Sequence, residues 1–232
     1  MDLLTITCWT YDINKYNFVD LVRQCFKVDD LEKIHLNLDN EYVIPGGVGG
    51  LGNDTDSHYH KLFYKLLNSG WEDFSQTYQQ IIREVIMKYM NTEKIVYQSK
   101  PSFRIQYPNS KAVTTWHYDS DENHKHPEWE INVQIALTEM KDSTCTWIES
   151  VPGVRDFKPM SMVPGEMYIF NGNKCYHGNK PNKTNKTRVS MDFRVIPYDR
   201  YNPDFENQSA TKRQKFLIGE YYSLMDLSLE NK

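Results

Sequence analysis

The sequence predicts a mainly β protein with flanking helices, because strand-like runs fill its second half and helical patterns fill its first. Short runs rich in β-branched and aromatic residues recur between about residues 95 and 200, separated by turns of Gly, Pro and Asn. Short strands separated in this way are typical of a sandwich or a barrel. A chain of 232 residues can bury one sizeable core, so we expect a single domain over residues 1–232.

Composition narrows the class of protein. The net charge of -4 differs from that of a nucleic-acid binder, whose surface is strongly basic. No apolar run approaches the roughly 18 residues that span a membrane, and the chain start lacks the basic n-region of a signal peptide. We therefore expect a cytoplasmic protein with reduced cysteines that binds neither nucleic acid nor membrane. No pattern in the sequence predicts the oligomeric state.

Residues 1–94 are expected to form a mostly helical support. Apolar residues recur at helical spacing over residues 16–26, about 56–68 and about 71–90. Gly70 separates the last two segments, as a C-terminal stop does. The glycine-rich stretch 46–52 has no Gly-Lys-Ser/Thr ending and is interpreted as a surface loop. Whether this loop or the C-terminal segment closes over a site is left open.

Seven strands are expected after the helices. They cover residues 95–98, 102–107, 113–118, 130–137, 144–149, 166–170 and 187–196. Arg104 and Gln106 share one face of the second strand, which either lines a substrate pocket or is a solvated sheet face. In the C-terminal extension, residues 201–232, the segment 215–225 is either a terminal strand or a short helix that Gly219 weakens. Core packing is favoured there for Tyr221 and Tyr222 over substrate contact.

Two segments carry residue types that bind iron. Side chains two apart on an extended strand point to one face, so His117 and Asp119 can reach into one cavity. His177 is the best third candidate, because it follows a turn and a short apolar strand that carries the chain back toward the core. Two imidazoles and one carboxylate form the facial triad of non-haem Fe(II) oxygenases and leave the opposite face open for a co-substrate and dioxygen.

An alternating strand after His177 supplies an anion site. Arg188, Ser190, Asp192 and Arg194 lie on one side of this strand. A guanidinium with a hydroxyl beside it suits a carboxylate held by two parallel hydrogen bonds. The strand therefore predicts a carboxylate-binding position near the metal.

Other candidate ligands are weighed against the triad. His124 and His126 belong to a polar stretch broken by Pro127, so we interpret them as loop residues and second-choice metal ligands. Cys175 lies two residues before His177, and the interpretation as a small apolar filler is favoured over a ligand role.

With these residues in this order, the chain resembles the Fe(II)/2-oxoglutarate-dependent oxygenases, nearest to the streptomycin-biosynthesis-type subgroup. The matching motifs lie in residues 117–132, 137–138, 149–153 and 188–194, within a resemblance that covers roughly residues 95–200. It implies that this region is a double-stranded β-helix, a jelly roll or cupin-like barrel.

The resemblance also implies roles for single residues. His117, Asp119 and His177 would be the catalytic iron ligands. Arg188 and Ser190 would bind the distal carboxylate of 2-oxoglutarate, and Asn132 would face the same acid.

The implied activity is a dioxygenase reaction that uses Fe(II), 2-oxoglutarate and O2, hydroxylates a small molecule and releases succinate and CO2. The polar loop 120–128, with Arg104 and Gln106, favours a polar substrate over a lipid. Asp119 fills the position that halogenases vacate for chloride, which disfavours halogenation. Desaturation or ring closure in place of hydroxylation, a catalytically inactive jelly-roll binding protein and a cupin-type metalloenzyme remain alternatives. A cupin needs His-x-His where this chain has His117-x-Asp119.

Overall fold

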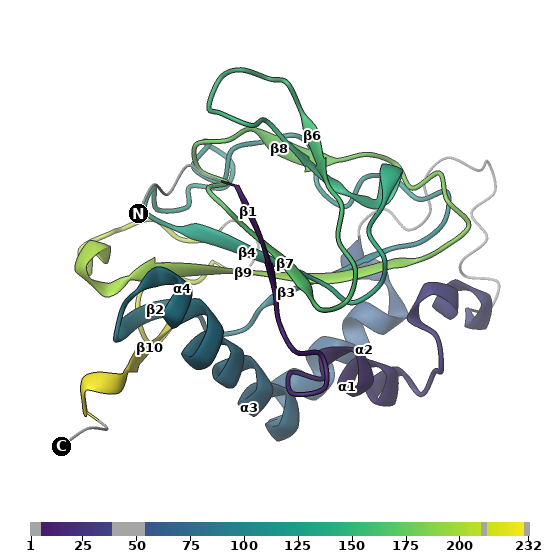
Figure 1. Cartoon of the computed structure of the whole chain (residues 1–232), viewed down its shortest axis with the longest axis horizontal. Helices are drawn as coiled ribbons and strands as arrows, with labels where there is room; N and C mark the ends of the chain where they lie inside the picture. The colour runs from purple at the N-terminus through teal and green to yellow at the C-terminus, as the bar shows by residue number, and fades with distance from the viewer. Residues whose placement is uncertain (1–5, 39–53, 210–212, 230–232) are drawn as a thin grey trace.

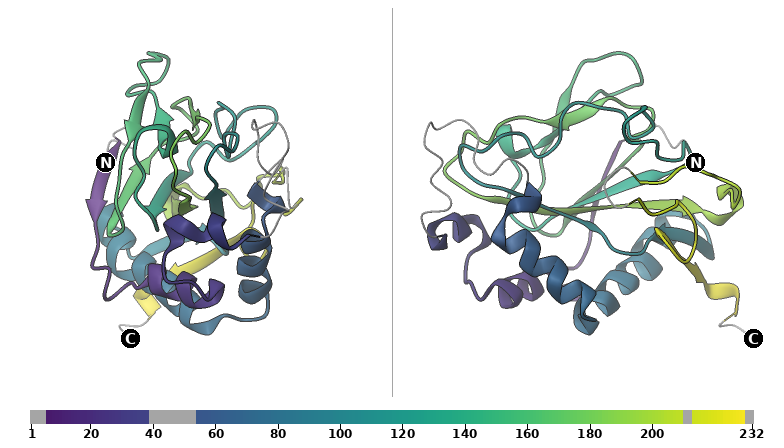
Figure 2. Two further views of the ribbon diagram at one scale, coloured as in Figure 1. Left: turned by 90° about the vertical axis from the view of Figure 1, so that its right-hand side faces the viewer. Right: turned by 180° about the vertical axis from the view of Figure 1, so that it is seen from behind.

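Two antiparallel sheets face each other, and the helices cover the outer face of the larger sheet (Figure 1). The structure is a computed structural model that describes residues 6–38, 54–209 and 213–229. Figure 2 shows, from the side and from behind, that the helices all lie on one side of the larger sheet. The architecture therefore has three layers: helices, the larger sheet and the smaller sheet. The predicted glycine-rich loop 46–52 lies outside the described residues.

The larger sheet has seven strands within the described ranges. Their order is β1 (Thr7–Thr10), β7 (Glu166–Phe170), β4 (Ile131–Ala136), β9 (Arg188–Pro197), β2 (Lys94–Gln98) and β10 (Tyr222–Asp226), with β3 (Ser102–Gln106) also paired to β9. The smaller sheet has the order β6 (Lys158–Met160), β5 (Thr146–Ile148) and β8 (His177–Asn179). All pairings within both sheets are antiparallel, which confirms the mainly β prediction.

The helical layer follows the predicted apolar spacing. It consists of α1 (Phe18–Phe26), α2 (His58–Asn68), α3 (Glu72–Ile81), a π-helical turn (Ile82–Ile86) and α4 (Met87–Met90). Short 3-10 helices cover Leu31–Asn37, Asp54–Asp56, Asp142–Thr144, Tyr198–Arg200 and Leu227–Leu229. Gly70 has φ +90°, a left-handed conformation that glycine adopts without strain, so the predicted stop between α2 and α3 is confirmed. No helix in the described ranges is long and apolar enough to cross a membrane.

Strict alternation along β4 and β9 divides the interior into an apolar and a polar compartment. The apolar face packs against the helices through Ile131, Val133, Ile135, Val189, Met191, Phe193 and Val195. The opposite face turns polar residues into the space between the sheets: Asn132, Gln134, Arg188, Ser190, Asp192 and Arg194. Because β9 is buried from Arg188 to Ile196, its polar face lines an internal cavity and is not a solvated surface.

The predicted strand over residues 113–118 is wrong. The segment makes only an isolated bridge, in which His117 and His177 exchange both backbone hydrogen bonds at 2.9 and 3.1 Å. The next bond along the segment goes from the amide of Asp119 to the carbonyl of Gly172, outside β8. A continuous ladder is therefore interrupted after one residue pair.

The C-terminal segment, for which a strand or a helix was left open, forms strand β10 beside β2. Gly219 lies before this strand with φ +93°, in a turn and not in a helix. Tyr221 and Tyr222 are buried in an apolar cluster around Phe216, which agrees with the packing interpretation.

We expect Phe63→Ala to lower the free energy of unfolding by about 3–5 kcal/mol. Phe63 is fully buried in α2 and stacks on Phe103 of β3, with 4.0 Å between ring centroids, so truncation leaves a cavity between helix and sheet. Chemical denaturation followed by circular dichroism measures the change. The control is Leu36→Ala, because Leu36 is 68% exposed and its loss should alter stability by less than about 0.5 kcal/mol. Equal midpoints for the two variants would contradict the packing.

Candidate metal centre and anion site

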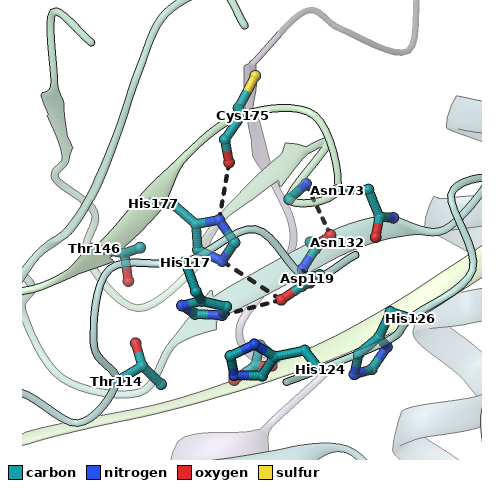
Figure 3. Close-up of polar contacts among 12 residues, drawn as sticks. Thr114, His117, Asp119, His124, His126, Asn132, Thr146, Asn173, Cys175 and His177 are labelled. Atoms are coloured by element: carbon teal, nitrogen blue, oxygen red, sulfur yellow. Dashed lines mark hydrogen bonds and ion pairs between the residues drawn. The ribbon is translucent and has the colours of Figure 1, made fainter. Parts of the chain in front are cut away.

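Three side chains of metal-binding type converge between the two sheets: His117, Asp119 and His177 (Figure 3). Their ligand atoms all lie within 4.8 Å of one another. Oδ1 of Asp119 is 3.2 Å from Nε2 of His117 and 3.7 Å from Nε2 of His177. All three residues are buried, with exposed fractions of 7%, 1% and 5%. Two imidazole nitrogens and a carboxylate oxygen at this spacing can hold a divalent cation such as iron.

Backbone carbonyls fix the tautomers of both histidines. Nδ1 of His117 lies 2.7 Å from the carbonyl of Thr115, and Nδ1 of His177 lies 3.0 Å from the carbonyl of Cys175. A carbonyl only accepts, so each Nδ1 carries a proton, and in the neutral ring each Nε2 has a lone pair that points to the centre of the cluster. The thiol of Cys175 lies in an apolar cluster, where burial raises its pKa to about 11, as expected for an inert filler.

The pKa values of His177 and Asp119 are shifted in the directions that metal binding needs. Burial lowers the pKa of His177 to about 4, although the charge of Asp119 opposes this shift. Burial also acts to lower the pKa of His117, but the hydrogen bond and charge of Asp119 outweigh it and raise that pKa. Burial alone would raise the pKa of Asp119, whereas the positive charge of Arg194 holds it well below its usual range. Near neutral pH, His177 is therefore neutral and Asp119 is ionised, as metal ligands must be.

The second oxygen of Asp119 has two partners of its own. Oδ2 accepts hydrogen bonds from Nδ2 of Asn132 at 2.6 Å and from Nη2 of Arg194 at 3.1 Å. The family resemblance implies that Asn132 faces the acid bound by Arg188. In the structure both polar ends of its amide are occupied, because its Oδ1 accepts from the backbone of Gly172 at 3.1 Å.

Arg188 is a buried cation whose charge has no carboxylate partner within the described residues. It is 1% exposed, and its Nη2 donates to Oγ of Ser190 at 2.9 Å. Its Nε and Nη1 find no acceptor in the described part of the chain. Burial, followed by repulsion from the nearby Arg104, lowers the pKa of Arg188 to about 10. A buried guanidinium with free N–H groups is the arrangement that an incoming carboxylate satisfies.

One cavity joins the histidines to Arg188. The space in it that is open to water-sized molecules is about 40 Å³. It is lined by Arg104, Thr114, His117, Asn132, Gln134, Thr146, Phe170, His177, Asn179, Arg188, Asp192 and Arg194. The walls are polar and largely buried, so the two histidines and the free guanidinium of Arg188 face one polar space.

Arg104 and Gln106 differ in their positions relative to this cavity. Arg104 lines it, but its guanidinium is paired with Asp192 at 3.3 Å and with Asp54 at 3.5 Å. Gln106 is absent from the lining residues, and its Nε2 donates to two backbone carbonyls at 2.7 and 3.1 Å. The expected substrate contact by Gln106 therefore gains no support from its position.

The second-choice histidines, His124 and His126, lie beside the cluster of His117, Asp119 and His177, which we call the metal-type cluster. The ring of His124 lies 4.2 Å from the ring of His117, centroid to centroid, and its Nδ1 binds Oδ1 of Asp121 at 2.8 Å. Nδ1 of His126 lies 2.7 Å from a carboxylate oxygen of the buried Glu130. The three-residue cluster found among the described residues contains neither of them.

Sequence reasoning missed the residues that surround Asp119. Arg194 was placed on the polar face of its strand, but not against the carboxylate. Gly172 was not singled out, although a Cβ there would lie 2.9 Å from side-chain atoms of both Asn132 and Asp119. Strand alternation indicated the face of Arg194. The register that sets Asn132 opposite Arg194 was not visible in a single sequence.

Comparison with known proteins supports the fold. No family model matches the chain. A similar sequence is the streptomycin biosynthesis protein StrG of Streptomyces griseus, which is 29% identical over 212 residues, 91% of this chain and 94% of StrG.

Among solved structures, the non-haem alpha-ketoglutarate-dependent epimerase SnoN from nogalamycin biosynthesis superposes with a TM-score of 0.54 at 10% identity, covering 96% of this chain and 94% of SnoN. EvdO2 from Micromonospora carbonacea var. aurantiaca, complexed with 2-oxoglutarate, gives 0.50 at 14% identity over 84% of this chain and 87% of EvdO2. The fold is therefore shared with non-haem 2-oxoglutarate-dependent enzymes.

We expect Arg188→Met to raise the free energy of unfolding in the absence of dicarboxylates. A buried donor without an acceptor costs about 1–3 kcal/mol, and an apolar side chain of similar length removes that cost. Urea denaturation in dicarboxylate-free buffer measures the change.

The matched comparison is Arg194→Met, which breaks ion pairs with Asp119 and Asp192 and should destabilise by about 3–5 kcal/mol. If both variants lose stability to the same extent, Arg188 has a structural partner within the protein and is not an open anion site.

Proposed function

We propose that this chain is a non-haem Fe(II)/2-oxoglutarate-dependent dioxygenase that hydroxylates a polar small molecule and releases succinate and CO2. The observation that carries the proposal is one cavity with a buried His-Asp-His cluster and, on its wall, a buried arginine without a carboxylate partner. The fold shared with 2-oxoglutarate-dependent enzymes supports it. So does the similarity to a protein of streptomycin biosynthesis, since that name indicates small-molecule chemistry.

The donor set fits Fe(II). His117 and His177 would each bind the metal through Nε2, because both Nδ1 protons are engaged by carbonyls. Asp119 would bind through Oδ1, because Oδ2 is occupied by hydrogen-bond donors. Two imidazoles and one carboxylate match the triad that leaves positions open for other ligands.

When bound, Fe(II), 2-oxoglutarate and O2 would supply the oxidative decarboxylation and the oxidant for the substrate C–H bond. Arg188 and Ser190 would bind the distal carboxylate of 2-oxoglutarate, and this carboxylate would accept hydrogen bonds from the free N–H groups of the guanidinium. The buried walls of the cavity would exclude water from the reacting groups. Asp119 occupies the ligand position that a halide would need, which supports hydroxylation over halogenation.

We further propose that the two sheets form the double-stranded β-helix, or jelly roll, of a single domain. A cupin-type metalloenzyme would require a histidine where Asp119 stands. An inactive binding relative would have no need to keep three buried ligands and a free arginine in one cavity. The polar loop 120–128 supports a polar substrate, because its His124 packs against His117 of the metal-type cluster. The cytoplasmic location and the lack of nucleic-acid binding stay predictions from composition.

Asp119→Ala should abolish succinate formation from 2-oxoglutarate, because the metal loses its carboxylate ligand. Far-UV circular dichroism should show that the sheets are retained. The assay measures succinate in the presence of Fe(II), O2 and pools of candidate metabolites. The proposal fails if a triple alanine variant at His117, Asp119 and His177 binds Fe(II) anaerobically as tightly as the wild-type protein.

Arg188→Lys should weaken 2-oxoglutarate binding while leaving metal affinity nearly unchanged, because an ammonium cannot reproduce the planar two-point contact of a guanidinium. Complete loss of such a buried pair costs roughly 2–5 kcal/mol, and Arg188→Met gives that limit. Calorimetric titration of the metal-loaded protein with 2-oxoglutarate measures both variants. Equal affinities for wild type and Arg188→Lys would move the anchor elsewhere in the cavity.

A further inference from the structure

We propose that Asn132 and Arg194 are positioning residues that hold Oδ2 of Asp119, so that only Oδ1 can bind the metal. We further infer that Asp192 and Arg104 extend this control along the cavity wall. The inference rests on the proposed metal site. It assigns Asn132 and Arg104 to the support of a metal ligand, in place of the co-substrate and substrate contacts that the sequence predicts for them.

The two oxygens of Asp119 face different surroundings. Oδ1 faces the Nε2 atoms of His117 and His177. Oδ2 accepts from Asn132 at 2.6 Å and from Arg194 at 3.1 Å. Rotation of the carboxylate about its bond to Cβ would break both hydrogen bonds inside a buried site, where unpaired donors are costly. The carboxylate is therefore held in one orientation before a metal arrives, with a single oxygen available.

Each of the two donors, Asn132 and Arg194, is fixed by a second hydrogen bond. The amide of Asn132 cannot turn, because its Oδ1 accepts from the backbone N–H of Gly172 at 3.1 Å. The guanidinium of Arg194 cannot swing away, because its Nη1 donates to Oδ2 of Asp192. Gly172 leaves room for this packing, since a Cβ there would lie 2.9 Å from atoms of both Asn132 and Asp119.

Arg104 lies at the far end of the same network. Its Nε donates to the other oxygen of Asp192 at 3.3 Å, and its Nη1 lies 3.5 Å from Oδ2 of Asp54. Acids and bases thus alternate from Asp54 through Arg104, Asp192 and Arg194 to Asp119. If Arg104 were lost, Asp192 would have a free oxygen with which to draw Arg194 away from Asp119.

The β-sheet register builds this network from three neighbouring strands. Asn132 of β4 lies opposite Arg194 of β9. Arg104 of β3 lies opposite Ser190, two residues before Asp192 on β9. Asp192 and Arg194 are two apart on one strand and point to one face. The orientation of the metal ligand therefore depends on the pairing of the larger sheet, although Asp119 itself lies outside that sheet.

The test is a titration of the metal-free full chain with Co(II), without 2-oxoglutarate, in charge-preserving variants. Asn132→Leu removes one donor to Oδ2. Arg194→Lys keeps the charge but cannot bind Asp119 and Asp192 together through a planar fork. Gly172→Ala inserts a methyl group between Asn132 and Asp119. Each should weaken Co(II) binding by about 10–100-fold, as losses of outer-shell partners typically do, and should alter the visible absorption spectrum of the bound Co(II).

Two further variants complete the design. Arg104→Lys tests the far end of the network and should weaken Co(II) binding by a smaller factor, because two residues separate it from Asp119. Gln134→Leu is the matched control for Asn132→Leu. Gln134 lies on the same buried face of β4, and its Oε1 has no partner among the described residues. Its loss should leave both Co(II) affinity and spectrum unchanged.

The possible results separate this inference from the function on which it rests. If wild type binds no Co(II), or if Asp119→Ala binds it equally well, the proposed metal site is wrong. If wild type binds through Asp119 but Asn132→Leu and Arg194→Lys match it in affinity and spectrum, the positioning role is overturned. An unchanged Arg104→Lys would restrict the network to Asn132 and Arg194 and overturn its extension. Should a buried variant fail to fold by circular dichroism, Gly172→Ala, which removes no polar group, decides the question.

Discussion

The structure depends on one constraint, the placement of charged side chains on the buried inner face of β9. Alternate residues of this strand pack against the helices, and the residues between them carry two arginines and an aspartate into the interior. Such charges cost free energy to bury unless they are paired or neutralised. Arg194 and Asp192 meet this demand within the protein, whereas Arg188 does not. Of the two arginines, Arg194 belongs to a network of ion pairs, whereas Arg188 keeps N–H groups without an acceptor among the described residues.

The three-layer arrangement supplies apolar burial that offsets the free-energy cost of these buried charges. The helices and the apolar face of the sheet form one continuous aromatic and aliphatic core, in which Phe63, Phe74 and Phe103 pack together. That core lies on the far side of the sheet from the cavity. Apolar packing and polar chemistry are therefore separated by a single layer of backbone, and substitutions in the cavity need not disturb the helical layer.

Local patterns carried much of the prediction. Alternation located β2, β3, β4, β5, β7 and β9, and helical spacing with Gly70 located α1, α2 and the segment of α3 and α4. The three ligand-type residues were found from residue type and order, and they converge in the structure. Their metal role stays a prediction, as do the roles of Arg188 and Ser190.

The missed contacts all depend on long-range register. Asn132 reaches Asp119 because β4 pairs with both β7 and β9, and Arg104 reaches Asp192 because β3 pairs with β9. A single sequence shows which face a side chain occupies, but not which residue lies across from it on another strand. The expected strand at 113–118 failed for the same reason, since a strand-like segment needs a partner and this one pairs only at His177.

The backbone around His117 pairs with another strand at one residue only. The backbone around His117 and Asp119 makes two hydrogen bonds with His177 and single ones with Gly172, Asn179 and His126, whereas β4 and β9 each pair with strands on both sides. Segments with few backbone bonds open at lower free energy than central strands. We therefore expect this segment to open at a lower free energy than β4 or β9. Local opening of this segment would expose His117 and Asp119 while the larger sheet stays folded.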